Sequence, residues 1–116
     1  MDGLIIKPKP LSLILQGKKT WELRGMRTHK RGRIALIRSG SGLVVGTCLL
    51  VDCIGPLDND TFTKTLTLHH SSHTEPPYAN TYAWVLDDVR VFAVPKPYVH
   101  PQGAIIWVCL NEISEE

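Results

Sequence analysis

Three side chains that could do chemistry together, Lys19, Glu22 and Arg24, lie within one short segment of the chain. The alternation of polar and apolar residues from 19 to 24 predicts a half-buried strand, on which Glu22 and Arg24 share a face. Lys19 precedes Glu22 by three positions, so all three converge only if Lys19 lies in the turn before the strand or if the strand is bulged. Arg24 is then suited to hold a phosphate or a carboxylate through two nitrogens.

Lys19 and Glu22 are the candidate catalytic residues if the chain is an enzyme, and with Arg24 they are candidate ligand-binding residues. A lysine serves as a general base when burial and a nearby cation lower its pKa. Glu22 can accept a hydrogen bond from the exocyclic amine of a nucleic-acid base, or it can move a proton. The alternative is a structural ion pair between Glu22 and Arg24 that closes the mouth of a barrel, with Lys19 exposed.

Basic residues are concentrated in the first third of the chain. Residues 1–40 hold ten lysines and arginines against two acidic residues, whereas the remainder holds three basic and nine acidic residues. Such a face suits phosphate groups, although a basic surface that binds nothing would have the same composition. Three candidates for phosphate contact fall in a loop predicted at residues 25–32: Arg27, Lys30 and Arg31.

Histidines and aromatic residues of the second half are weaker candidates. The cluster His69-His70-x-x-His73 falls in a predicted loop, with no acidic or cysteine ligand at a standard offset, so neither a metal site nor a cofactor is predicted. The three tryptophans are flanked by aliphatic residues at strand positions and are expected in the core. Four side chains at loops or strand ends are candidates for stacking on a base: Tyr78, Tyr82, Tyr98 and His100.

Periodicity and turn signals predict the elements that must position these residues. The predicted strands cover residues 3–6, 19–24, 33–38, 43–54, 82–94 and 103–110. The predicted helices cover residues 9–16 and 61–68, the second capped by Asp60, and a polar loop covers 69–80. Gly46 predicts a bulge, Asp87-Asp88 interrupt the next strand, and Pro95 and Pro97 are expected to end it. Together they predict an α+β fold, a small mixed β-barrel of five to six strands with two short helices.

Length and composition limit the classes of protein. The 116 residues, 43% hydrophobic and 21% charged, are typical of a single globular domain, predicted to cover residues 1–116. The longest apolar run, from Leu43 to Val51, is too short to span a membrane, and no signal peptide is recognisable at the N-terminus. The three cysteines lie in apolar runs without close spacing, which predicts reduced, buried thiols and a cytoplasmic location.

The segment around Lys19 also resembles a known family. Gly17, Lys19, Glu22 and Arg24 fill the pattern G-x-K-x-x-E-x-R after a short helix, the mark of the ASCH family, here of a small stand-alone bacterial type. The resemblance implies a fold like the PUA domain of RNA-modifying enzymes. It also implies one of two activities, since some members remove the acetyl group from N4-acetylcytidine and others are ribonucleases. In those amidohydrolases a threonine nucleophile follows the motif lysine by three residues, whereas this chain has Glu22 there and its nearest threonine is Thr20.

Two classes of function follow. The first is a module that binds RNA or a modified nucleoside in a Lys/Glu/Arg pocket beside a basic face. The second is a small hydrolase of the same family, either an amidohydrolase of the N4-acetylcytidine type or a ribonuclease. Glu22 in place of threonine favours the binding module, and a domain without a fused catalytic partner favours the enzyme. RNA or a modified nucleoside is the expected partner in both cases, with no membrane and no metal, and the sequence leaves the oligomeric state open.

Overall fold

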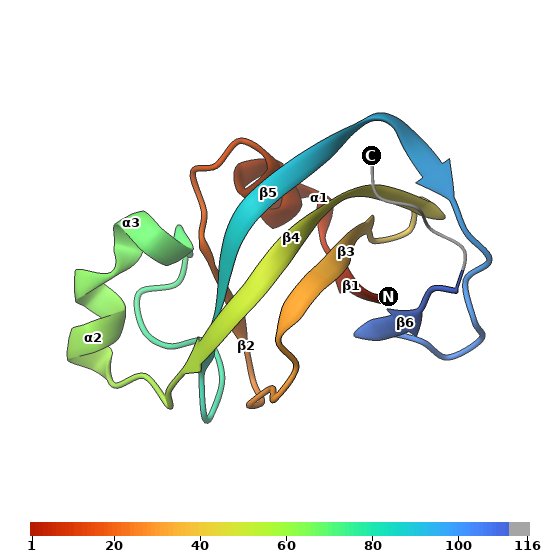
Figure 1. The fold of residues 1–116 in the computed structure, drawn as a ribbon. Coiled ribbons are helices and arrows are strands. Elements are labelled where there is room, and N and C mark those ends of the chain that lie inside the picture. The colour runs from red at the N-terminus through yellow and green to blue at the C-terminus, as the bar shows by residue number, and fades with distance from the viewer. Residues whose placement is uncertain (112–116) are drawn as a thin grey trace.

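The structure, a computed structural model, describes residues 1–111 and contains one six-stranded sheet in the order β2-β5-β4-β3-β1-β6. Figure 1 shows that the sheet curls into a half-barrel, with α2 and α3 at one end and β6 at the other. The strands are β1 (Asp2–Ile6), β2 (Trp21–Arg24), β3 (Gly32–Arg38), β4 (Leu43–Ile54), β5 (Tyr82–Pro97) and β6 (Trp107–Cys109). The helices are α1 (Pro8–Leu15), α2 (Asn59–Lys64) and α3 (Leu66–His69).

The sheet is mixed, as predicted. Strand β3 pairs with β4 across a tight turn at residues 39–42, and β4 pairs with β5, both antiparallel. Strand β1 runs parallel to β3, and α1 and β2 come between them in the chain. A curled sheet of six strands with short helices confirms the predicted small α+β fold. Within residues 1–111 there are three helices where two were expected.

The curl of the sheet depends on irregularities in β4. Its pairing with β3 shifts register between Leu36 and Ile37, and its pairing with β5 shifts at three further places, one of them between Val44 and Gly46. A Cβ atom at Gly46 would collide with the carbonyl oxygen of Arg90 on β5, so only glycine allows the two backbones to approach this closely. The bulge predicted at Gly46 is therefore confirmed.

The predicted second helix differs from the observed helices. Asp58, not Asp60, caps α2, and its side chain accepts a hydrogen bond from the backbone N–H of Thr61 at 2.7 Å. The helical segment is interrupted at Thr65, whose hydroxyl bonds the carbonyl of Thr61 at 2.8 Å in place of continuing a regular helix. The α3 segment then ends at His70, which adopts a left-handed conformation with φ of 53°.

Two strand predictions also need correction. Strand β5 continues through Pro95 and Pro97, which were expected to end it, and Pro97 lies opposite Leu43 of β4. Beyond Val85, β5 pairs with β4 alone among the strands of residues 1–111, so its other side is an edge of the sheet. Proline is tolerated at such an edge, because the N–H that it lacks would have no partner strand there. Strand β6 is shorter than predicted, since Gly103 adopts a turn conformation with φ of 83°.

The core fills the concave side of the sheet around Trp84, which is fully buried and stacks on Trp107 at 5.7 Å between ring centroids. Cys48 and Cys53 are buried as predicted, and burial raises the pKa of the Cys48 thiol to about 12. Cys109 is exposed, contrary to the prediction, because it lies on the short last strand at an edge of the sheet. No helix among residues 1–111 is long and apolar enough to cross a membrane.

Candidate functional site

A cavity of about 540 Å³ opens where α1, β2 and the segment after α3 meet. That volume falls in the range of pockets that hold small molecules. Its lining includes all three residues that the sequence singled out, Lys19, Glu22 and Arg24. The other lining residues come from β1, from α1 and the residue before it, from β2, the β3–β4 turn and α3, and from the loops on either side of β5: Ile5, Lys7, Lys9, Pro10, Leu13, Leu23, Ser39, His69, His70, Ser71, Ser72, His73, Pro77, Tyr78 and Ile105.

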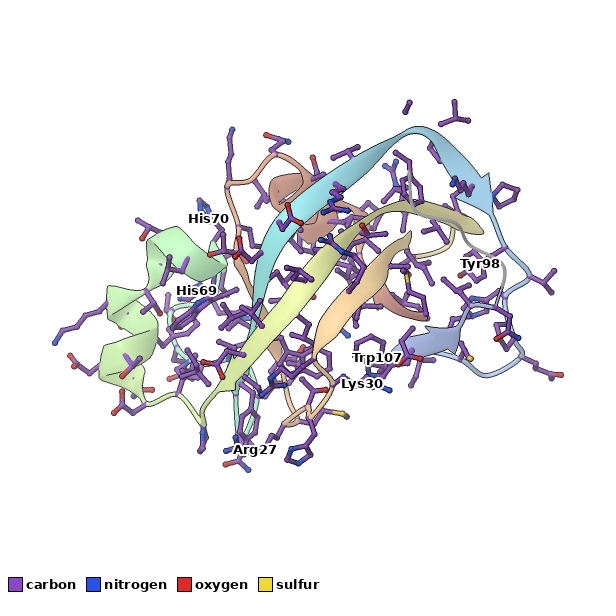
Figure 2. All side chains as sticks on the ribbon, viewed as in Figure 1. Arg27, Lys30, His69, His70, Tyr98 and Trp107 are labelled. Atoms are coloured by element: carbon purple, nitrogen blue, oxygen red, sulfur yellow. The ribbon has the colours of Figure 1, made fainter. Side chains whose placement is uncertain are left out.

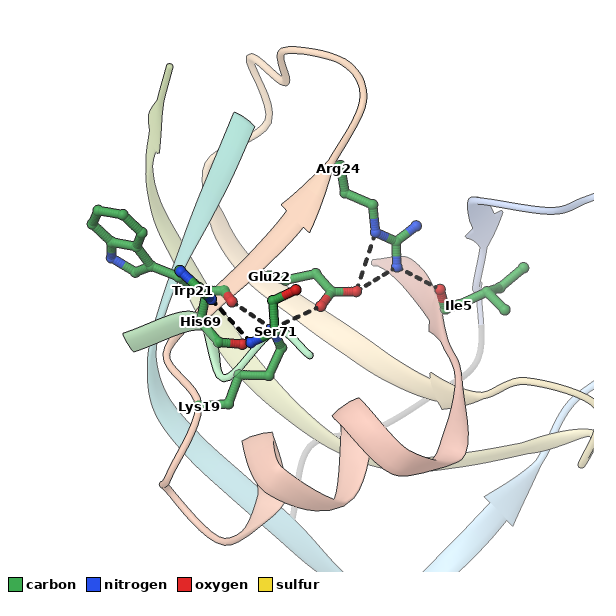
Figure 3. A network of polar contacts seen from close by, with 7 residues as sticks. All are labelled: Ile5, Lys19, Trp21, Glu22, Arg24, His69 and Ser71. Carbon is green, nitrogen blue, oxygen red and sulfur yellow. Dashed lines mark hydrogen bonds and ion pairs between the residues drawn. The ribbon is translucent and has the colours of Figure 1, made fainter. Parts of the chain in front are cut away.

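Lys19 lies in the turn between α1 and β2, and this placement allows its side chain to reach Glu22. Its ammonium donates hydrogen bonds to the carbonyl oxygens of Trp21 at 2.7 Å and His69 at 2.6 Å. It also lies 3.4 Å from Oε1 of Glu22 (Figure 3). Three acceptors thus surround a group with three hydrogens. Only 5% of Lys19 is exposed, contrary to the alternative in which it was a surface lysine.

Glu22 and Arg24 share a face of β2, as their spacing predicts. Oε2 of Glu22 accepts from Nε of Arg24 at 3.2 Å and from Nη2 at 2.9 Å. Glu22 is 7% exposed. Its carboxylate has a cation at each oxygen, Lys19 on one side and Arg24 on the other. Such pairing offsets the cost of burying a charged group.

Arg24 also connects two strands that are not neighbours in the sheet. Its Nη2 donates to the carbonyl oxygen of Ile5 on β1 at 2.9 Å, although three strands separate β2 from β1 in the strand order. The curl of the half-barrel brings them together, as the close view in Figure 3 shows. The guanidinium lies 5.7 Å from the ring centroid of Trp84, and its Nη1 has no acceptor among residues 1–111. One donor therefore remains available to a ligand.

Sequence reasoning missed His69, which was placed in a polar loop. It is fully buried, its ring stacks on Phe62 at 4.4 Å, and its carbonyl accepts from Lys19. Nδ1 accepts from the backbone N–H of Ser71 at 2.9 Å, so Nε2 carries the proton and donates to the carbonyl of Phe62 at 2.8 Å. Burial lowers the pKa of His69. The ring is therefore neutral and fixes the segment that contributes one wall of the cavity.

The cavity lining carries an excess of positive charge. Lys7 and Lys9, at the start of α1, are exposed and have no ion-pair partner within residues 1–111. With Lys19 and Arg24 they outnumber the single carboxylate of the lining, Glu22. Burial lowers the pKa of Lys19, and the Glu22 carboxylate opposes that change. An anionic ligand is favoured at such a site.

The three cations of the predicted basic loop lie outside the cavity lining, and each has hydrogen-bond partners within the protein. Arg27 donates to the carbonyl of Gly55 at 3.1 Å and lies over the Tyr82 ring. Lys30 pairs with Asp2 at 2.8 Å and lies 5.2 Å from the centroid of Trp107. Figure 2 shows both in the lower part of the view, away from His70.

Arg31, the third of them, bonds the carbonyls of Thr28 at 3.1 Å and Lys30 at 2.7 Å. The structure therefore brings Lys19, Glu22 and Arg24 together but not the basic loop with them.

The remaining candidates separate into two groups. Tyr78, His70 and His73 line the cavity, although no three histidine, cysteine, aspartate or glutamate side chains within residues 1–111 are placed to hold a metal ion. Tyr98 and His100 are joined by a 2.7 Å hydrogen bond and lie outside the cavity lining, and Figure 2 shows Tyr98 far from His70. Of these two groups, only the first lines the cavity that holds Glu22 and Arg24.

Comparison with known proteins agrees with the fold. Three solved structures of ASCH from Zymomonas mobilis resemble this chain. The first is 19% identical with a TM-score of 0.64 and covers 78% of this chain and 68% of that chain. Two mutant forms of the same protein are 18% and 16% identical, with TM-scores of 0.72 and 0.62, and cover 95% of this chain and 87% and 89% of theirs. At such identities the likeness shows the fold alone.

No curated protein matches the chain significantly. The family comparison is more informative, because the ASCH domain matches residues 4–97 and this range contains every residue of the Lys19, Glu22 and Arg24 network. The match extends over most of the chain and confirms the resemblance seen in the sequence. The protein therefore belongs to the ASCH domain family.

Proposed function

We propose that the protein binds RNA and takes one nucleoside of it, unmodified or modified, into the cavity beside Glu22. The observation that carries the proposal is the Glu22 carboxylate held between Lys19 and Arg24 at the wall of a 540 Å³ cavity. The carboxylate is a fixed acceptor, and Nη1 of Arg24 is a donor beside it. Base edges present amines next to acceptor atoms, so the pair complements such an edge.

The charge of the lining supports a nucleotide over a neutral ligand. Lys7 and Lys9 are exposed at the rim, where they are free to contact the phosphates on either side of the bound nucleoside. The cations of residues 27–31 are engaged with Asp2 and with backbone carbonyls. Lys7 and Lys9 are accordingly the favoured phosphate ligands, and Arg27, Lys30 and Arg31 are the second candidates.

Binding without chemistry is favoured over hydrolysis by the state of Lys19. A general base needs a free lone pair, whereas three acceptors surround the ammonium of Lys19 and stabilise its protons. The slot three residues after it holds Glu22 and not a threonine nucleophile. The hydrolase alternative retains one supporting feature, which is that burial lowers the pKa of Lys19.

The test is a binding and turnover assay with labelled single-stranded RNA and a panel of N4-acylated cytidines, followed by product analysis. Binding without product is expected, and Glu22→Gln should abolish most of it while the matched surface variant Lys18→Ala should not. Product formation by the wild type that is lost in Lys19→Met would replace this proposal by the hydrolase. Absence of binding to every probe would refute both.

Salt dependence separates the two candidate phosphate surfaces. Binding to single strands weakens with salt with a slope of about 0.7 for each phosphate contact. The double variant Lys7→Ala/Lys9→Ala should reduce that slope by about 1.4. The triple variant Arg27→Ala/Lys30→Ala/Arg31→Ala should reduce it less. The reverse order would move the phosphate contacts to the basic loop.

A further inference from the structure

Tyr78 is an exposed aromatic side chain for which the core of the fold supplies no packing role. It lines the cavity that holds Glu22 and Arg24, yet 47% of it is exposed. We propose that Tyr78 is the stacking platform for the base of the bound nucleotide, and that the ligand is therefore an unpaired nucleotide of single-stranded RNA. This inference rests on the proposed function and specifies its substrate class.

The backbone around Tyr78 holds the ring in place without covering it. The N–H of Tyr78 donates to the hydroxyl of Thr81 at 3.0 Å, and that hydroxyl bonds back to the carbonyl of Tyr78 at 3.3 Å. Thr81 is buried, with 1% exposure, so the turn is anchored in the protein. Two prolines, Pro76 and Pro77, precede the ring and restrict the chain further.

Gly25 packs closely against the side chain of Tyr78. A Cβ atom placed on Gly25 would lie 3.0 Å from Cδ1 of Tyr78 and 3.2 Å from Cγ, closer than ordinary van der Waals contact. Gly25 directly follows Arg24, so the ring packs against the end of the strand that carries the polar residues. Backbone contact on one side and an open cavity on the other are what a stacking platform requires.

The other aromatic candidates are engaged elsewhere. Tyr82 lies under the guanidinium of Arg27 at 4.9 Å, and Tyr98 is bonded to His100 away from the cavity. Trp84 is fully buried. Among the tyrosines, tryptophans and phenylalanines of the described part of the chain, only Tyr78 both lines the cavity and is exposed.

The combination selects for an unpaired base. A base in a duplex has both faces covered by its neighbours and its pairing edge occupied, so it can offer neither a face to Tyr78 nor that edge to Glu22. A single-stranded or splayed-out base offers both at once. Stacking does not discriminate among bases, because each has an aromatic face. Any sequence preference would therefore come from Glu22 and Arg24.

The experiment measures binding of oligoadenylate, oligouridylate, their duplex, adenosine monophosphate and ribose 5-phosphate, which lacks the base. Tyr78→Ala should weaken single-strand and adenosine monophosphate binding by about 5- to 150-fold, and leave ribose 5-phosphate binding unchanged. Tyr78→Phe keeps the ring and should restore most of the affinity. Leu66→Ala is the matched control, since Leu66 is 53% exposed and lies outside the cavity lining.

Gly25→Ala tests the platform without removing the ring. It should weaken adenosine monophosphate binding in the wild-type background and have no further effect in the Tyr78→Ala background. If Tyr78→Ala does not fold, the effect of Gly25→Ala on adenosine monophosphate binding by itself tests the inference. Duplex bound as tightly as single strands, or Tyr78→Ala binding like the wild type while Glu22→Gln does not, would overturn the inference and leave the proposed function standing. No binding of any probe by the wild type would overturn both.

Discussion

Lys19→Met removes the one group that joins three separate backbone and side-chain acceptors beneath the cavity. Methionine has nearly the length of lysine and no charge, so it fills the space and removes the hydrogen bonds. The carbonyl oxygens of Trp21 and His69 then lose their donor. Glu22 keeps Arg24 but loses its second cation.

The cost follows from burial of the acceptors. Leaving a buried acceptor unsatisfied costs about 1–3 kcal/mol for each group. Removing one partner of a buried ion pair costs about 3–5 kcal/mol. Part of this is recovered because the ammonium no longer has to be transferred out of water. We expect Lys19→Met to lower the free energy of unfolding by about 3–5 kcal/mol, which for a domain of this size corresponds to about 12–20 °C in Tm.

The assay is urea unfolding followed by tryptophan fluorescence, with Lys18→Met as the matched control. Lys18 adjoins Lys19 in the chain but is exposed, and its substitution should leave stability within about 0.5 kcal/mol of the wild type. A loss below about 1 kcal/mol for Lys19→Met would be the value of an exposed ion pair. That outcome would refute the view that Lys19 is a buried, fully bonded ammonium.

Three further outcomes are expected. Burial holds the pKa of His69 below its ordinary value of 6.5, so on acidification the unfolded chain binds a proton at this histidine before the folded protein does. The free energy of unfolding should therefore fall as pH decreases below about 6.5. The urea midpoints of His69→Gln should lack that part of the decline. Iodoacetamide at mildly alkaline pH should label Cys109 and spare Cys48, whose burial raises its pKa to about 12, and mass spectrometry that finds equal labelling would contradict this. Asp58→Ala should lower Tm more than Asp60→Ala, because only Asp58 bonds the first turn of α2; equal Tm values would contradict the assigned cap.

The polar network was predictable to the extent that it is local in sequence. Gly17 ends α1 with φ of 76°, which places Lys19 in a turn and not on the strand. Two-residue periodicity then puts Glu22 and Arg24 on one face. The requirement that Lys19 lie in the turn for the three to converge is met by the structure.

What the sequence did not predict comes from contacts between distant segments. His69 is fifty positions from Lys19, and nothing local shows that its carbonyl completes the ammonium site. A histidine among serines and threonines has the composition of a loop, and its burial follows from stacking on Phe62 and from the hydrogen bonds of both ring nitrogens. Likewise, nothing local in the sequence distinguishes Lys30 from the other surface lysines. Its ion pair with Asp2, at 2.8 Å, depends on the position of β1 in the fold.

The bond from Arg24 to Ile5 has a consequence for the size of the ligand. Two strands joined by a backbone ladder are held about 4.8 Å apart and leave no space between them. Strands β2 and β1 are joined instead by the guanidinium of Arg24, so the length of this side chain sets the distance between the two strands. Arg24→Lys or Arg24→Gln would therefore alter the spacing of β2 and β1 as well as remove the guanidinium donor beside Glu22. One substitution at position 24 is thus expected to alter the opening between β1 and β2 while every strand pairing of the sheet is left intact.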